Sequence, residues 1–240
     1  HINIIHHEKN RGLSAARNTG IKSGTGEVII FLDSDRTVQP NWISEHINIL
    51  RNNNVVGVIG DSQLPHGNIP TKLDSYLYDP RRGARRFGEG TPIRFPYFLL
   101  NNTSLKRSVF DVIEFFDENI MSYGGEDTEL AIRLWEAYPD GLRFSFSATC
   151  EHHHHRELND YCNLMYGYGK TNLPSLLEQF PQYNTELGGQ WIKSIKGYLL
   201  FNPIVRFWVA KTRHFRNSFW LSKYLVIDAV IRGARTVSRQ

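Results

Sequence analysis

Two carboxylates one residue apart, Asp33 and Asp35, end the apolar run of residues 28–32. Such a run, rich in β-branched side chains, is typical of a strand buried on both faces of a parallel sheet. Open α/β sheets bind their ligands at the carboxyl ends of such strands. Neighbouring carboxylates repel each other unless a cation joins them. The pattern indicates a metal and phosphate site, although a plain turn explains the same residues equally well.

Glu126 and Asp127 form a second acidic pair, directly behind Gly124 and Gly125. The apolar spacing that follows predicts an amphipathic helix that begins near residue 126. Helix capping and the helix dipole explain a single acid in a first turn. Two preceding glycines let the backbone approach a ligand closely, so the doublet is a second candidate for a ligand site.

A possible nucleotide-binding segment lies near the beginning of the chain. Gly12 permits a tight turn, and residues 14–21 are expected to form a helix. Arg17 and Asn18 on that helix could face the phosphates or ribose of a nucleotide. The alternative is a solvated arginine and a capping asparagine.

Four consecutive histidines, residues 152–155, follow a strand expected at residues 142–148. Imidazoles bind divalent transition metals, and alternate residues of an extended segment face the same way. His152 with His154, or His153 with His155, could therefore form a pair. We expect one histidine to reach the site and the others to be solvated.

The basic segment of residues 61–96 lacks a periodic pattern, which predicts a long loop. Within it, four arginines lie in six consecutive residues, Arg81, Arg82, Arg85 and Arg86. Such a cluster could hold a diphosphate or an acidic acceptor. A mobile, solvated loop is the alternative.

Alternating strands and helices are expected to position these residues. The expected strands are residues 1–5, 28–32, 55–59, 95–100 and 142–148, and the expected helices are residues 14–21, 40–50, a short one from about 106, one from 126, and 159–170. This order predicts a βαβ-type sheet whose strand ends meet at one edge.

The C-terminal part of the chain is strongly basic. From residue 203 onward, eight basic residues oppose Asp228 alone. This part therefore has a net charge of +7 and the rest of the chain about −3, which gives the total of +4. Aromatic residues interleave with Lys and Arg on expected helices, which fits binding in the plane of an anionic membrane. A helical pair packed on the preceding domain explains the pattern equally well. No segment has the roughly 20 uninterrupted apolar residues of a membrane span.

Four segments, in this order, resemble the family 2 glycosyltransferases, which have the GT-A nucleotide-sugar-binding fold. They are residues 9–18, residues 31–35, residues 116–118 with 124–134, and the histidine after the next strand. The resemblance covers roughly residues 3–170. It implies a GT-A (Rossmann-like) α/β domain over residues 1–175, with a mixed sheet flanked by helices, and a basic helical region over residues 176–240.

The resemblance also implies a role for each matched residue. Asp33 and Asp35 look like the D-x-D pair that holds Mn²⁺ or Mg²⁺ on the diphosphate of the donor, with His152 as a further metal ligand. Asp127, with Glu126 beside it, resembles the general base. The residues expected on the nucleotide-sugar side are Asn10, Gly12, Arg17, Asn18, Asp33, Ser34, Asp35 and Asn102.

Members of this family normally begin with two further strands, which hold the base and ribose of the nucleotide, and these strands have no counterpart before residue 1. We therefore expect an N-terminally incomplete domain that binds its donor weakly. With Cys150 and Cys162 as the only cysteines, a reducing compartment is the default.

The implied activity is metal-dependent, inverting sugar transfer from a nucleotide sugar, with a UDP-sugar as the first choice. The acceptor would be a saccharide or a lipid-linked molecule in surface polysaccharide or glycolipid synthesis, at the cytoplasmic face of the membrane and without nucleic acid. The alternative is a decayed transferase that binds a membrane or an acidic polymer through its C-terminus. A histidine-ligated metal hydrolase is least favoured, because no helical H-E-x-x-H adjoins the histidines.

Overall fold

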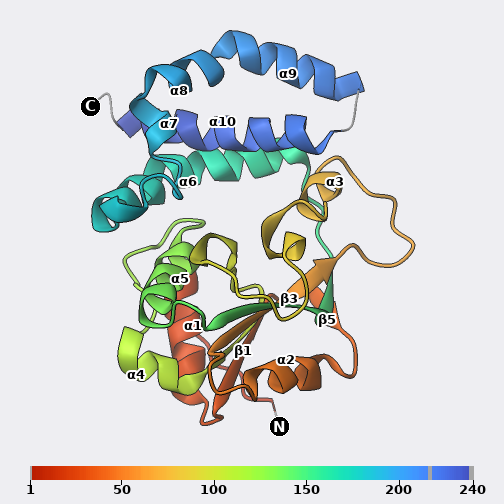
Figure 1. Cartoon of the computed structure of the whole chain (residues 1–240), viewed down its shortest axis with the longest axis vertical. Helices are drawn as coiled ribbons and strands as arrows, with labels where there is room; N and C mark the ends of the chain where they lie inside the picture. Colours follow the sequence, from red (N-terminus) through yellow and green to blue (C-terminus); the bar gives the residue numbers. More distant parts are fainter. Residues whose placement is uncertain (1, 216–217, 238–240) are drawn as a thin grey trace.

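The structure is a computed structural model that describes residues 2–215 and 218–237. A twisted sheet covered by helices forms one half of the molecule, and a layer of helices that carries the C-terminus forms the other (Figure 1). The predicted α/β class, with a mixed sheet flanked by helices and a C-terminal helical region, is confirmed.

The helices and strands, in chain order, are α1 (Gly12–Ser23), β1 (Val28–Leu32), β2 (Arg36–Val38), α2 (Trp42–Leu50), β3 (Gly57–Gln63), α3 (Asp74–Leu77), β4 (Asn102–Lys106), α4 (Phe110–Ile113), α5 (Glu126–Ala137), β5 (Leu142–His152), α6 (Leu158–Gln179), α7 (Gln190–Lys193), α8 (Ile195–Leu200), α9 (Pro203–Phe215) and α10 (Phe219–Val237). Short 3-10 turns include Gly83–Arg86 and Phe95–Tyr97.

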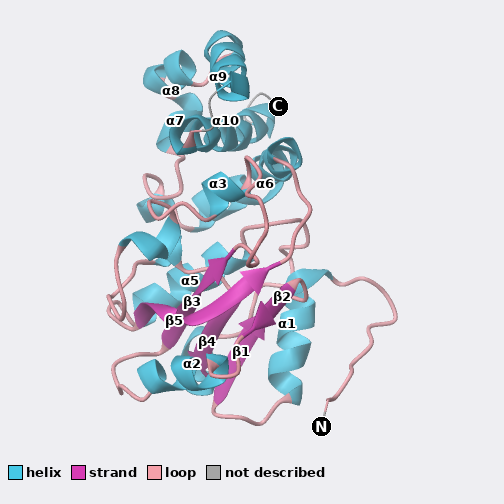
Figure 2. Ribbon diagram, turned by 90° about the vertical axis from the view of Figure 1, so that its right-hand side faces the viewer, coloured by secondary structure: helices cyan, strands magenta, loops and turns pink. Residues whose placement is uncertain are grey.

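The sheet has the strand order β1-β4-β3-β5-β2 (Figure 2). β3 and β5 are parallel, β4 is antiparallel to both β1 and β3, and β2 is antiparallel to β5. Therefore β1, β3 and β5 all run in the same direction. Their carboxyl ends meet at one edge of the sheet, as predicted, together with the amino end of β4.

The environment of β1 differs from the prediction. Among the described residues it pairs only with β4, and its side chains are half-buried or exposed rather than buried on both faces. β4 comes from a distant part of the sequence and inserts in antiparallel orientation. An apolar run does not reveal such a neighbour, so the inference of a fully buried parallel strand was wrong.

Two other strands were misplaced. Residues 2–5 are irregular with exposed isoleucines, because no strand of the described chain offers them hydrogen bonds; residue 1 lies outside the described residues. Phe95–Tyr97 forms a 3-10 turn in which Pro96 lacks a backbone donor, and β4 begins only at Asn102.

The main core lies between one face of the sheet and helices α1, α4 and α5. It includes Ile21, Leu105, Phe110, Leu130 and Phe144. α2 covers the opposite face through Leu50, which packs with Val55 and Val58. The sheet edge that carries the acids is thereby held between two packed helical surfaces.

The helical layer begins with α6 and is closed by α10. α6 runs through the predicted domain boundary at 175/176 and places Leu176 in the core beside the sheet.

Where α6 and α10 cross, each contributes a glycine. A Cβ atom on Gly169 would lie 2.1 Å from the Val230 carbonyl oxygen, and one on Gly233 would lie 2.1 Å from the Tyr166 carbonyl oxygen. The two backbones are therefore in direct contact.

We predict that Gly169→Ala lowers the free energy of unfolding by about 1–3 kcal/mol, because the new methyl group must push the α10 backbone away. Urea unfolding followed by circular dichroism measures the change. Gly167→Ala, on the same helix with no atom within 4 Å of its Cβ position, is the matched control. It should leave stability unchanged or raise it by up to about 1 kcal/mol. Equal stability of both variants would contradict the close helix contact.

Candidate active site

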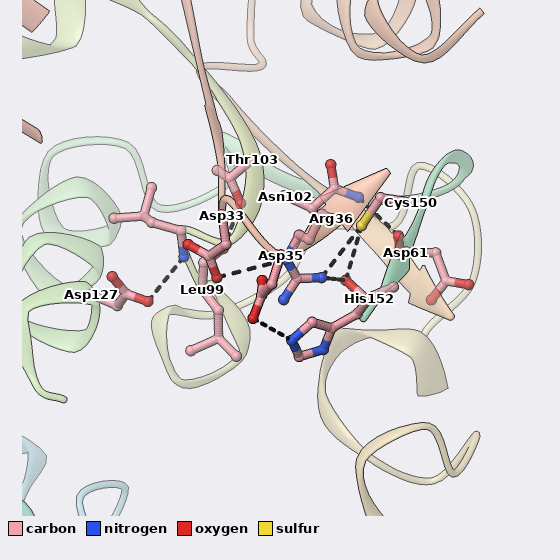
Figure 3. A network of polar contacts seen from close by, with 12 residues as sticks. Asp33, Asp35, Arg36, Asp61, Leu99, Asn102, Thr103, Asp127, Cys150 and His152 are labelled. Carbon is pink, nitrogen blue, oxygen red and sulfur yellow. Dashed lines mark hydrogen bonds and ion pairs between the residues drawn. The ribbon is translucent and has the colours of Figure 1, made fainter. Parts of the chain in front are cut away.

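The turn between β1 and β2 places Asp33 and Asp35 at the carboxyl edge of the sheet. β2 pairs with β5 so that Arg36 lies opposite His152, which brings the histidine beside the second aspartate. His152 Nε2 lies 3.3 Å from Asp35 Oδ2 (Figure 3), and the backbone N–H of His153 donates to the Asp35 carbonyl oxygen at 2.8 Å. Strand pairing thus joins residues more than a hundred positions apart.

These residues are chemically suited to a metal ion that is also bound by a substrate. Asp35 Oδ1 is a buried atom without a hydrogen-bond partner in the described structure. Burial, with Arg36 nearby, lowers the pKa of His152 to about 4, so its imidazole is neutral. No three His, Cys, Asp or Glu side chains of the described residues converge closely enough to hold an ion by themselves. Mg²⁺ commonly takes one or two protein carboxylates and completes its shell with water and phosphate oxygens.

Arg36 is a buried cation beneath this pair that sequence analysis missed, although it follows Asp35 directly. Its Nε lies 3.6 Å from Asp33 Oδ2, and its Nη1 donates to Ser62 Oγ at 2.7 Å and to Cys150 Sγ at 3.3 Å. Burial raises the pKa of Asp33, and the positive charge of Arg36 opposes that rise. Arg36 therefore favours the ionised form of Asp33, whereas burial alone favours the protonated form.

Asp127 lies on the first turn of α5 and lines the same cavity as Asp33 and Asp35. The turn depends on Gly125, whose φ of 103° is unfavourable for other residues. Arg17 Nη1 donates to Asp127 Oδ1 at 2.5 Å, and the backbone N–H of Leu100 donates to Oδ2 at 3.1 Å. Both oxygens are oriented by these bonds, and 17% of the side chain remains exposed.

Glu126 shares the arginine of its neighbour. Arg17 Nη1 reaches Glu126 Oε1 at 3.2 Å and also donates to the Leu100 carbonyl oxygen. Burial, followed by the charge of Asp127, raises the pKa of Glu126 to about 7, against the opposing effect of Arg17. The role of Arg17 in this structure is thus to balance the acidic doublet.

The histidine run divides between two directions. His152 and His154 lie on the same side, with ring centroids 4.8 Å apart, whereas His153 contacts Thr37. His152 Nδ1 lies 3.0 Å from the Tyr78 hydroxyl, and His154 Nε2 lies 2.8 Å from Asp74 Oδ1 in a buried pair. These contacts fasten the loop around α3 to the site. No local sequence signal identifies Tyr78 or Asp74 as partners.

Several residues expected on the donor side serve the scaffold in this structure. Asn102 is 0% exposed; it accepts from Trp42 Nε1 and donates to two strand carbonyl oxygens, so its amide is used within the sheet. Asn18 is buried and bridges α1 to Phe116. Asn10 accepts from the Gly12 N–H at the start of α1. Asn10, Gly12, Asn18 and Asn102 do not line the cavity described next.

The cavity has a volume of about 1380 Å³. The sheet edge with Asp33, Ser34 and Asp35 forms part of its wall, and the start of α5, the loop around α3, and residues of α6 and α10 form the rest. Two of the four loop arginines are neutralised internally: Arg85 pairs with Asp61 at 2.6 Å, and Arg81 with Asp79 at 2.6 Å.

Comparisons with known proteins agree with this arrangement. Residues 1–112 match the family model described as Glycosyl transferase family 2. Rat polypeptide N-acetylgalactosaminyltransferase 13 is 28% identical over 152 residues, which cover 56% of this chain and 27% of that protein. Glucosyl-dolichyl phosphate glucuronosyltransferase of Haloferax volcanii is 26% identical over 160 residues, which cover 62% of this chain and 50% of that protein.

Two solved structures share the fold. S. aureus TarS residues 1–349 superpose with a TM-score of 0.50 at 13% identity, covering 97% of this chain and 72% of that one. GalNAc-T7, solved with UDP, GalNAc and Mn²⁺, superposes with a TM-score of 0.50 at 15% identity, covering 80% of this chain and 44% of that one. These matches and the sheet define a GT-A-like fold.

The first 112 residues are thus similar to the family 2 glycosyltransferases, and both curated relatives are named as sugar transferases. The chain spans only about a quarter to a half of the length of these curated relatives.

We predict that Arg17→Met destabilises the protein by about 3 kcal/mol or more at about pH 8, because it leaves the buried Glu126 and the half-buried Asp127 without their cation. The raised pKa of Glu126 means that the folded state holds this proton more tightly than the unfolded state. Stability therefore falls as pH rises from about 4.5 to about 7. The loss in Arg17→Met should consequently be smaller at about pH 5, where Glu126 is protonated, as urea unfolding at both pH values will measure.

Arg11→Met is the matched control, since it removes an exposed ion pair with Glu118 and should have little effect at either pH. Adding Glu126→Gln to Arg17→Met should restore part of the lost stability at high pH. A pH-independent loss in Arg17→Met would show that Arg17 acts by packing rather than by charge.

Proposed function

We propose that this chain transfers a sugar from a nucleotide-sugar donor, with a UDP-sugar as the first choice, to a saccharide or lipid-linked acceptor, using Mn²⁺ or Mg²⁺. The observation that carries the proposal is the convergence of Asp33, Asp35, His152 and Asp127, from three separate elements, around one cavity. The same proposal assigns residues 1–175 to the transferase domain and residues 176–240 to a helical C-terminal region.

Asp35 and His152 would hold the metal, with Asp33 toward the ribose or sugar of the donor. A bound divalent ion would offset the charge of the departing nucleoside diphosphate. Ser34 and Arg17, which line the same cavity, complete the donor side of this proposal. GalNAc-T7, which shares the fold, was solved with UDP and Mn²⁺, which supports this choice of ligands.

Asp127 would act as the general base. Its carboxylate takes the proton of the acceptor hydroxyl while the acceptor oxygen bonds to the anomeric carbon, and the bond from that carbon to the diphosphate oxygen breaks. A single displacement of this kind inverts the anomeric configuration. Arg17 and the Leu100 N–H fix the orientation of the carboxylate, and Glu126 beside it binds a proton readily near neutral pH.

The biological setting remains part of the proposal: surface polysaccharide or glycolipid synthesis at the cytoplasmic face of a membrane. The name of the Haloferax volcanii relative includes a dolichyl phosphate, which supports a lipid-linked acceptor. Among the described residues, no helix has the length and apolar character needed to cross a bilayer.

Peripheral membrane contact, which would also suit the alternative of a non-catalytic binding module, is supported by one face of α9. Ile204, Phe207, Trp208 and Lys211 follow the helical spacing i, i+3, i+4, i+7 and are exposed. Part of the C-terminal basic charge has an internal partner, since Arg206 and Arg232 both contact Asp228. We infer that the apolar side chains of α9 contribute more to membrane binding than net charge does.

The metal site is tested by Asp35→Ala. We expect Mn²⁺-dependent binding of UDP to weaken by at least about tenfold, because the variant removes a metal ligand. Isothermal titration calorimetry with UDP, with and without Mn²⁺, measures this. Asp140→Ala, an exposed acid outside the cavity, should bind UDP like the wild type, and Asp127→Asn should also retain UDP binding. If Asp35→Ala binds UDP with Mn²⁺ as tightly as the wild type, the assignment of Asp35 is wrong.

The membrane contact is tested by the double variant Phe207→Ser/Trp208→Ser, whose side chains are 60% and 58% exposed. Its partition onto vesicles rich in phosphatidylglycerol should fall by at least about tenfold, because two large apolar groups no longer leave water. Co-sedimentation measures the bound fraction. Ile43→Ser/Val112→Ser, at comparable exposure on α2 and α4 far from α9 (Figure 1), is the control. Equal loss of binding in both double variants would refute a specific role for α9.

A further inference from the structure

The cavity that holds the carboxylates also has a cationic side, toward the helical layer. Arg82 after α3, Arg156 before α6 and Lys223 on α10 line it. We call these three residues the basic rim. Within the described residues none of them has a carboxylate within 4 Å, whereas Arg17 and Arg36 beside the catalytic acids do. The rim therefore brings uncompensated positive charge to the cavity.

Aromatic rings hold the rim cations in place. The rings are Tyr76 under Arg82 at 4.9 Å, Trp220 under Lys223 at 5.2 Å and Tyr123 under Arg156 at 6.0 Å. Arg82 also reaches the Tyr161 hydroxyl of α6 at 3.5 Å. A ring orients a cation but contributes far less than a counter-ion. The three charges are thus positioned without being neutralised, as in a site prepared for an anion.

The rim adjoins the proposed base rather than the proposed donor site. Tyr123 immediately precedes the glycine turn that begins α5, and it lines the cavity. Its ring lies under Arg156, and its pKa is raised by burial and by the nearby charges of Glu126 and Asp127, against the opposing charges of Arg156 and Arg82. An acceptor whose hydroxyl approaches Asp127 would therefore have the rest of its length near the rim.

We propose that the basic rim binds a phosphate carried by the acceptor, so that the natural acceptor is a phosphate-bearing molecule. The guanidinium groups of Arg82 and Arg156 have the planar donor geometry that suits phosphate oxygens. The donor diphosphate is already accounted for by the metal site at Asp35. The cavity of about 1380 Å³ also exceeds the roughly 300–1,000 Å³ of ordinary small-ligand sites, leaving room for a second substrate.

This inference rests on the proposed function for the direction of transfer, but the anion site can be tested by itself. The probes are a soluble oligo(glycerol phosphate), vesicles that contain phosphatidic acid, and a neutral malto-oligosaccharide of equal length. We expect the full chain to bind a phosphate probe at least about tenfold more tightly than the neutral one, since charge-assisted contacts exceed neutral ones. Binding should weaken as salt rises from about 50 to about 200 mM.

Arg156→Ala/Lys223→Ala should weaken binding of the phosphate probe by at least about tenfold, with unchanged circular dichroism and thermal unfolding. Arg82→Gln should act in the same direction, and Arg82→Lys should retain more affinity because it keeps the charge. Arg51→Ala, an exposed arginine outside the cavity, should have no effect. Preference for the soluble oligomer or for the vesicles then distinguishes a polymer from a lipid headgroup.

Equal affinity for the neutral probe, or unchanged phosphate binding in Arg156→Ala/Lys223→Ala, would overturn the proposal. It would also be overturned if the rim variants weakened binding of UDP with Mn²⁺ as much as that of the phosphate probe, because the cations would then serve the donor. Wild-type protein that binds the phosphate probe through the rim but does not bind UDP with Mn²⁺ would support the anion site and contradict the proposed function.

Discussion

The concentration of negative charge at one edge of the sheet is the constraint on which the rest of this structure depends. Carboxylates that lie close together and are partly shielded from bulk water repel one another. Arg17 and Arg36, both largely buried, offset this repulsion from opposite sides, one at the acidic doublet of α5 and the other at Asp33. Asp35 Oδ1 is left without a partner in the described chain. Additional positive charge, whether from a metal or from a substrate, is therefore best accommodated beside Asp35.

Sheet topology makes this arrangement rigid. The pairing of β2 with β5 fixes His152 beside Asp35, and the antiparallel insertion of β4 carries Leu100 to Asp127. At the crossing point, Asn102 donates to the carbonyl oxygens of Asp61 and Ala148, so the polar groups at the strand ends satisfy one another. Groups held by strands and buried hydrogen bonds are oriented before a substrate arrives, which is the condition for electrostatic catalysis.

Local sequence patterns were sufficient to locate the ends of individual strands and helices. The acids after β1 and at the start of α5 were placed correctly, because an apolar run and a helical period each fix where an element ends or begins. The exposed edge position of β1 and the start of β4 could not be predicted, since they depend on which strands pair. Asn18 and Asn102 resembled ligand-binding residues in sequence, yet their amides are used by partners about a hundred and about forty to sixty residues away.

The helical layer relates the two proposed surfaces to each other. α10 contributes Lys223 to the rim and packs backbone-to-backbone on α6, while α9 lies on the outer side of α10 (Figure 1). Packed helix axes are about 8–10 Å apart, so the α9 axis is separated from the α6 side of the cavity by about two such spacings. Lys223, however, lies on α10, the helix against which α9 packs. The rim therefore suits a phosphate in a lipid headgroup as well as one within an extended polymer.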